Sequence, residues 1–90
     1  MLEITRNKGD SRNDFVFGVT IDGKHKYTVW FSENYYKTLA GGKLEPEELV
    51  KKSFEFLLER EGPQSILPEF ELPLISRYFP EFEEYIKQSN

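Results

Sequence analysis

The sequence contains no cysteine, and it has only one histidine in 90 residues. The lack of cysteine excludes disulfide bonds, thiolate metal sites and a cysteine nucleophile, and a single histidine excludes histidine-rich metal centres. No run of about 18 apolar residues is present, so no segment has the character of a transmembrane helix. The first residues lack the basic and then apolar layout of a signal peptide. We therefore expect a cytoplasmic protein without a membrane span.

Positive charge is also scarce, and it is unevenly placed. The chain carries 12 Lys and Arg against 16 Asp and Glu, which gives a net charge of −4. Residues 1–44 hold seven basic and five acidic side chains, whereas residues 45–90 hold five and eleven. Because nucleic-acid binding depends largely on phosphate neutralisation by Lys and Arg, this balance argues against a nucleic-acid partner. The asymmetry would also let one half of the chain meet the other half of a second copy.

Aromatic side chains, by contrast, are abundant. Eight Phe, five Tyr and one Trp make up 16% of the chain. Disordered chains are poor in aromatics, so the composition predicts a folded protein, and its length predicts a single domain over residues 1–90. A domain of this size buries only somewhat more than about 60% of its unfolded surface. We therefore expect self-association, most simply as a homodimer, to supplement the core.

Residues 1–31 show the two-residue alternation of apolar side chains that is typical of β-strands. The stretch Asn7–Asp14 has no apolar side chain and predicts a loop between the first and second strands. The dipeptide Asp22-Gly23 predicts a tight hairpin before the third strand. These signals together indicate a three-stranded antiparallel β-meander.

The register of the hairpin can be predicted from its apolar faces. A two-residue loop would place a lysine opposite a large apolar side chain. A three-residue loop over Ile21–Gly23, with the glycine in the left-handed region, places Phe17 opposite Tyr27 and Phe15 opposite Val29. We prefer the three-residue loop because it keeps the large apolar side chains together on one face.

The rest of the chain carries helix signals. Ser32 is a suitable N-cap and Gly41-Gly42 a suitable end for a short helix, although a loop fits this stretch nearly as well. Pro46 suits the first position of the main helix, predicted over residues 46–61, which Gly62-Pro63 ends.

Residues 63–88 are punctuated by prolines, and each proline can start a short helix but fits no helix interior. The pattern predicts one turn over residues 63–67, a short helix over 73–79 and a final helix over 80–87. The whole chain is therefore predicted to be an α+β domain, in which a helical C-terminal half packs on one face of the three-stranded meander.

Catalytic motifs are missing from the sequence. His25 lies between Lys24 and Lys26 near the predicted hairpin tip, where neither a pocket nor an orienting partner is expected. The serines lack a nucleophile elbow, and the glycines do not form a phosphate-binding loop. We expect no catalytic residue, no cofactor and no metal site. A non-catalytic protein-interaction domain is the interpretation that the residues favour.

Trp30 is the most informative exception to the pattern. It is predicted on the more polar face of the sheet, on the side opposite to Tyr27, where a large aromatic side chain needs cover. A helix of the same chain could provide that cover; otherwise Trp30 marks a surface for a partner or a second copy. Tyr35 and Tyr36 follow closely, so Tyr27, Trp30, Tyr35 and Tyr36 form the candidate interaction surface. The same four side chains would line the pocket of an alternative small-ligand binder or enzyme.

The C-terminal half resembles a small uncharacterised prokaryotic protein family. The resemblance is carried by three segments, which are Ser53–Glu61, Ser65–Leu67 and Ile75–Phe82. It implies no established activity.

Residues 14–60 show a weaker resemblance to HicB-like antitoxin domains. It is carried by the strand, the Asp22-Gly23 turn, the following strand, and then Thr38, Gly42, Leu44 and Glu47–Leu49 at a helix start. In place of the Pro-Asp-Leu-Pro-Gly run of that family, this chain has Ser32–Tyr36. The resemblance implies a β-β-β-α core, self-association and binding to a small RNA-cleaving toxin. An antitoxin-like regulator is therefore the alternative function.

Overall fold

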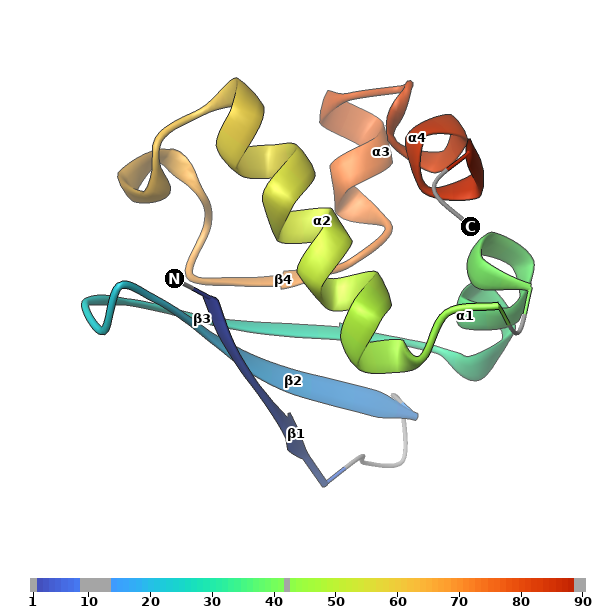
Figure 1. Ribbon diagram of the computed structural model, residues 1–90, viewed down its shortest axis with the longest axis horizontal. Helices are drawn as coiled ribbons and strands as arrows, with labels where there is room; N and C mark the ends of the chain where they lie inside the picture. Colours follow the sequence, from blue (N-terminus) through green and yellow to red (C-terminus); the bar gives the residue numbers. More distant parts are fainter. Residues whose placement is uncertain (1, 9–13, 42, 89–90) are drawn as a thin grey trace.

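The chain folds into one sheet and a set of helices that lie on one side of it (Figure 1). The computed structural model describes residues 2–8, 14–41 and 43–88, so most of the predicted first loop and Gly42 lie outside the described residues. In chain order the elements are β1 (Leu2–Asn7), β2 (Phe15–Ile21), β3 (His25–Phe31), α1 (Glu33–Ala40), α2 (Pro46–Arg60), the 3-10 turn η1 (Pro63–Ser65), β4 (Glu69–Glu71), α3 (Leu74–Tyr78) and α4 (Phe82–Gln88).

The first three strands form the predicted antiparallel meander, in the order β1-β2-β3. The hairpin register differs from the prediction by two residues, because Phe17 lies opposite Val29 and Phe15 opposite Phe31. The loop between the paired residues is Asp22, Gly23 and Lys24 rather than Ile21–Gly23. A shift of two residues leaves every side chain on its predicted face, since the strand repeat is two.

The turn itself also differs from the predicted loop. Asp22 and Gly23 both have positive φ, 53° and 70°, and the Lys24 N–H donates to the Ile21 carbonyl at 3.0 Å. Two successive residues in the left-handed region make a type I′ turn, which suits the Asp-Gly sequence and the twist of the strands. The predicted type I turn needs only one such residue.

The prediction of a three-stranded sheet is wrong by one strand. Residues 69–71 form β4, which pairs in parallel with β3 and completes a mixed sheet of four strands. The N–H of Thr28 donates to the Pro68 carbonyl at 2.8 Å, and the N–H of Leu72 donates to the Trp30 carbonyl at 2.9 Å. The alternation of Glu69, Phe70, Glu71 and Leu72 is a strand signal that the prolines on either side of it obscured.

The short helix α1 is present where the sequence left a helix and a loop open. The Ser32 hydroxyl accepts from the Tyr35 N–H at 3.1 Å, which satisfies one of the free donors of the first turn. At the other end, Gly41 adopts φ 57° and its N–H donates to the Lys37 carbonyl at 2.9 Å. Both predicted caps are confirmed.

The main helix α2 begins at Pro46 and ends at Arg60, one residue short of the prediction. The Glu48 carboxylate accepts from the Glu45 N–H at 3.1 Å and closes the first turn. The helix crosses the covered face of the sheet (Figure 1). The residues that it buries are Pro46, Leu49, Val50, Ser53, Phe54, Phe56 and Leu57.

The C-terminal helices α3 and α4 are separated at Pro80, as predicted. The apolar side chains of these two helices are only partly buried: Ile75, Phe82 and Ile86 lie in the core, whereas Tyr78 keeps 67% of its surface exposed. One continuous core of aromatic and aliphatic side chains therefore joins the sheet, α2 and α4, and leaves Tyr78 outside it.

Candidate functional site

The structure does not bring the four predicted surface residues together. Tyr27 points into the core, where its ring lies 5.4 Å from that of Phe54, and Trp30 lies on the opposite face of the sheet. No continuous surface or pocket can contain both side chains. The predicted aromatic pocket is therefore not formed by these residues.

Two of the three tyrosines in this set contact the backbone at the two ends of the main helix. The Tyr36 hydroxyl donates to the carbonyl of Leu44, just before α2, and the Tyr27 hydroxyl donates to the carbonyl of Pro63, just after α2. Burial raises the pKa of both hydroxyls, and nearby glutamates add to the effect at Tyr36. These contacts give both side chains a structural role that the sequence pattern did not indicate.

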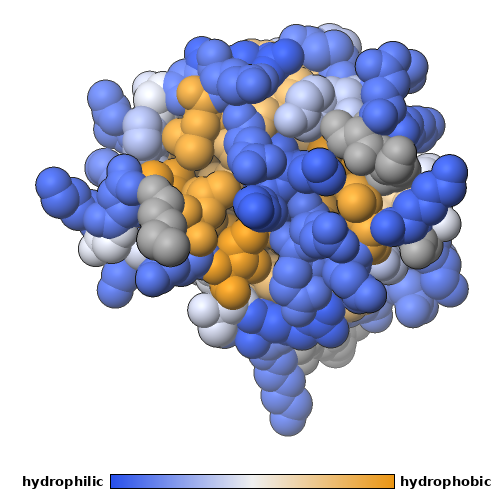
Figure 2. Space-filling model, viewed as in Figure 1, coloured by the Kyte–Doolittle hydropathy of each residue, from blue (hydrophilic) through white to orange (hydrophobic). Residues whose placement is uncertain are grey.

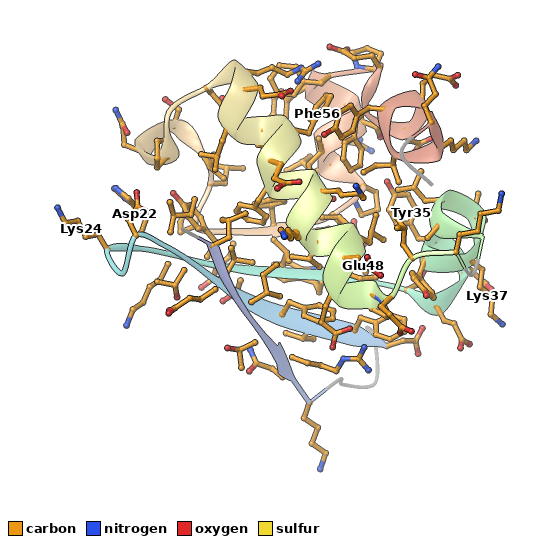
Figure 3. All side chains as sticks on the ribbon, in the orientation of Figure 1. Asp22, Lys24, Tyr35, Lys37, Glu48 and Phe56 are labelled. Carbon is orange, nitrogen blue, oxygen red and sulfur yellow. The ribbon has the colours of Figure 1, made fainter. Side chains whose placement is uncertain are left out.

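Tyr35 lies between α1 and α4 (Figure 3). Its hydroxyl is buried, and within the described part of the chain no hydrogen-bond partner of normal geometry reaches it. Burial and the nearby Glu83 carboxylate raise the pKa of this hydroxyl strongly. Tyr35 is thus part of a helix contact and is not available on a surface.

Trp30 lies on the open face of the sheet, which the helices leave uncovered (Figure 1). The cross-strand neighbours of Trp30 are Val16 on β2 and Glu71 on β4. No helix of the described chain supplies the cover that the sequence analysis allowed for, and the side chain stays partly exposed. The rest of this face carries mainly short polar and charged side chains, which are Glu3, Thr5, Asn7, Gly18, Thr20, Lys26, Thr28 and Glu69.

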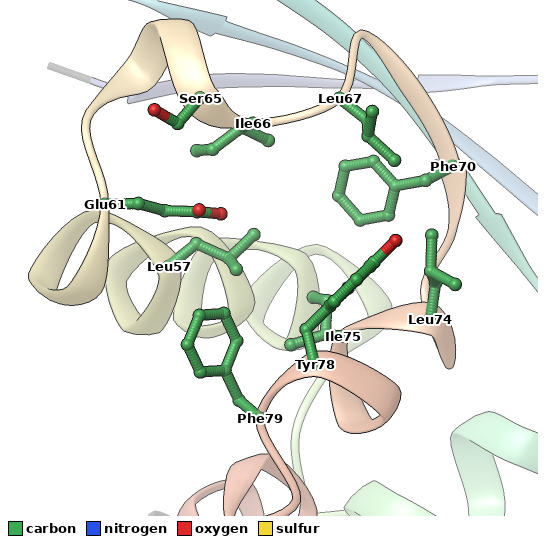
Figure 4. A pocket seen from close by; sticks show the side chains of 10 residues that line it. All are labelled: Leu57, Glu61, Ser65, Ile66, Leu67, Phe70, Leu74, Ile75, Tyr78 and Phe79. Carbon is green, nitrogen blue, oxygen red and sulfur yellow. The ribbon is translucent and has the colours of Figure 1, made fainter.

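The best-formed hollow lies elsewhere, on the helical side of the molecule. It is a groove of about 340 Å³ between the end of α2, the η1–β4 connection and α3 (Figure 4). We call it the C-terminal groove. Its lining contains the Glu61 carboxylate and the hydroxyls of Ser65 and Tyr78, and all the other side chains are aliphatic or aromatic. The lining residues are Leu57, Glu61, Ser65, Ile66, Leu67, Phe70, Leu74, Ile75, Tyr78 and Phe79.

The prolines of this region explain how the groove forms. Gly62-Pro63 ends α2 and turns the chain into η1. The N–H of Ile66 donates to the Pro63 carbonyl at 3.2 Å at the end of this turn. β4 then carries Phe70 inward against Phe54, with ring centroids 6.0 Å apart. Pro73 starts α3, which returns beneath the groove. Because each segment is too short to pack closely on the next, a hollow is left between them.

The two large apolar side chains that are most exposed in the described structure both belong to this groove. Leu67 keeps 48% of its surface exposed and Tyr78 keeps 67%. Figure 4 places them above and below the opening, with the buried ring of Phe70 between them and the partly buried ring of Phe79 beside Tyr78. Exposed apolar side chains that surround a hollow are typical of a binding surface. The sequence analysis did not predict the groove. The one available signal was that each of these side chains lies within two residues of a proline.

The chemistry available in the groove is that of binding. Its polar side-chain groups are the Glu61 carboxylate and the Ser65 hydroxyl, near the end of α2, and the Tyr78 hydroxyl on the opposite side. Among the described residues no three potential metal ligands come together. His25 lies at the hairpin, on a different part of the molecule. In the part of the chain that the structure describes, no helix is both long and apolar enough to span a bilayer.

Comparison of the chain with models of protein families, with curated proteins and with solved structures gives no match. The two resemblances of the sequence analysis therefore stay predictions. The groove and the open sheet face are the two surfaces on which a functional interpretation can be built.

Proposed function

We propose that this protein is a non-catalytic interaction domain, and that the C-terminal groove holds large apolar side chains of another protein. The observation that carries the proposal is the position of Leu67 and Tyr78, the two most exposed large apolar side chains of the described structure, at the opening of one apolar hollow. Covering them with a partner would remove apolar surface from water, at about 25 cal/mol per Å². Such anchors dominate the affinity of many protein interfaces.

The size of the groove favours a small docking element. A volume of about 340 Å³ accepts two or three side chains, which is too little for the whole face of a long helix. Pockets of this size commonly receive the anchor residues of a short segment. A short apolar segment of a partner is therefore the occupant that we propose.

The test is a pull-down from lysate of the source cells with four matched baits, read by mass spectrometry. The baits are the wild type, Leu67→Glu, Tyr78→Glu and Gln64→Glu. Gln64 is exposed beside the groove but does not line it, so its variant adds the same charge without touching the docking surface. We expect a protein that the wild type and Gln64→Glu retain and that both groove variants lose. An identical set of proteins on all four baits, or none on the wild type, would contradict the proposal.

The identity of a groove-dependent partner also bears on the alternative function. Recovery of a small RNA-cleaving protein would support the antitoxin-like role that the resemblance of residues 14–60 implies. Recovery of an unrelated partner would leave the interaction domain and remove the antitoxin alternative.

We further propose that self-association, which the small core and the uneven charge favour, uses the open sheet face around Trp30. Trp is enriched among residues that dominate binding energy at interfaces. Light scattering of the wild type and of Trp30→Thr tests this proposal. We expect a dimer for the wild type and a monomer for the variant. A monomeric wild type at high concentration would contradict it.

A further inference from the structure

Among the residues that the structure describes, Glu61 is the only charged one that lines the C-terminal groove. It directly follows the last helical residue of α2, and its backbone N–H donates to the Leu57 carbonyl at 2.9 Å. Figure 4 shows its side chain reaching into the hollow, with the carboxylate between Leu57 and Ile66. A carboxylate in this position is held over apolar surface by the helix end that carries it.

This carboxylate has no partner in the described part of the chain. No ion pair or side-chain hydrogen bond joins Glu61 to another described residue. Its neighbour Arg60 is committed elsewhere: the guanidinium lies 3.6 Å from the centre of the Phe56 ring and 3.4 Å from the Glu81 carboxylate. The adjacent cation is therefore not available to the groove.

The C-terminal half of the chain, which forms the groove, is acidic. Residues 45–90 carry eleven acidic and five basic side chains. A carboxylate on apolar surface in such a field attracts a cation more strongly than an isolated surface carboxylate, because solvent screens it less.

We propose, resting on the proposed function, that the segment docked in the C-terminal groove carries a Lys or Arg beside its large apolar side chain. The cation pairs with Glu61 at the end of the groove nearest α2. The apolar side chain lies among Leu67, Phe70 and Tyr78 at the other end. The aliphatic stem of Lys or Arg suits the lining between the two ends, since such stems pack on apolar surface while the charged group stays near water.

Three probes of equal chain length separate the charge from the apolar contact. Hexylammonium stands for the docked lysine side chain, hexanol for the apolar chain alone and hexanoate for the opposite charge. Binding is followed by the amide shifts of Leu67, Phe70 and Tyr78 in two-dimensional NMR spectra. For the wild type we expect hexylammonium to bind about five-fold more tightly than hexanol, with hexanoate the weakest.

The variant Glu61→Gln should remove this preference and leave the binding of hexanol unchanged. The matched control is Glu69→Gln, which removes the same charge from an exposed position outside the groove lining. It should keep most of the preference. Raising the salt concentration should reduce the preference for hexylammonium in the wild type and leave hexanol unaffected.

The outcomes separate the two proposals. Equal binding of all three probes, with shifts at the groove, would keep the docking function and overturn the selection of a cation. An absence of shifts with every probe would overturn both. If light scattering finds a dimer that Glu61→Gln dissociates, the occupant is a second copy, and the proposal of another protein's segment is overturned.

Discussion

The two flanks of α2 differ in how they are covered: one is packed against other parts of the chain, and the other faces the C-terminal groove. On one flank, the ring of Phe56 lies 5.0 Å from that of Tyr85, 5.2 Å from Phe82 and 5.8 Å from Phe79. Arg60 covers the same ring and pairs with a glutamate of the next segment. On the other flank, Leu57 and Glu61 face the C-terminal groove. Figure 2 shows a polar ridge that follows the exposed side of α2.

We call the flank with Phe56 and Arg60 the closed flank, and the flank with Leu57 and Glu61 the open flank. On the closed flank, the chain itself supplies apolar surface, a cation and a carboxylate. The open flank has the apolar surface and the carboxylate, but the described chain supplies no cation to it. The groove therefore lacks the cation that completes the corresponding contact on the closed flank of α2.

The largest effect is expected for Phe56→Ala, which removes the centre of the closed flank. Phe56 is fully buried and contacts three aromatic rings, so the change should lower the free energy of unfolding by about 3–5 kcal/mol. Urea denaturation followed by circular dichroism measures this. A loss below that of Leu57→Ala would contradict the comparison.

A smaller loss is expected for Leu57→Ala on the open flank. Leu57 is 4% exposed, but it borders the groove and has fewer neighbours on that side. The cavity that the change leaves is continuous with the groove, so the loss should fall near the lower end of the usual range, at about 2 kcal/mol. The same denaturation experiment gives the value, with Leu58→Ala as a partly buried reference.

The contribution of the cation on the closed flank can be measured with Arg60→Ala. The guanidinium stacks on Phe56 and also donates to the Phe56 carbonyl at 3.1 Å, so we expect a loss of about 1 kcal/mol. The reference is Lys37→Ala, whose side chain is 67% exposed and pairs with Glu33 at 3.9 Å. This exposed pair should contribute about 0.5 kcal/mol or less. Equal losses of stability in the two variants would show that the stacking of Arg60 on Phe56 contributes nothing.

The smallest effect at neutral pH is expected for Tyr35→Phe, beside the closed flank. The buried hydroxyl has no hydrogen-bond partner of normal geometry among the described residues, so its removal should change stability by less than about 1 kcal/mol. At alkaline pH the two proteins should differ more. Since the pKa of Tyr35 is raised above 10.0 in the folded chain, the protonated hydroxyl stabilises the folded state below that pH, and this contribution is lost as pH rises.

The variant should therefore lose stability less steeply above pH 10 than the wild type. Part of the alkaline loss will remain, because burial also raises the pKa of Tyr27, Tyr36 and Tyr85. Denaturant titrations between pH 8 and pH 11.5 compare the slopes. The same slope in both proteins would contradict the assignment to Tyr35.

Local signals predicted most of the elements. The caps at Ser32 and Gly41, the start of α2 at Pro46 and the meander with its Asp22-Gly23 turn all depend on neighbours in the sequence. The register was wrong because the predicted and the observed pairing differ by two residues, and both place the same side chains on the same face. β4 was missed because its pairing with β3 joins residues far apart in the chain.

The candidate site was the hardest part to predict. Composition and aromatic spacing pointed to the four residues from Tyr27 to Tyr36, but strand alternation separates Tyr27 from Trp30, and the hydroxyls of Tyr27 and Tyr36 bind backbone around α2. The groove arises from the way several short segments pack, which no single segment specifies. Only the exposed Leu67 and Tyr78 mark it, and exposure is not visible in a sequence.

The parallel pairing of β3 with β4 has a consequence for the order of events in the cell. The chain must complete α2 and fold back before β4 can join the sheet, and the groove also needs α3, which follows β4. During synthesis on the ribosome, the groove should therefore be absent until the residues of α3 have emerged. Until then the edge of β3 is open to any other strand. Binding in the groove, as proposed above, would thus report that the chain has been translated at least through α3.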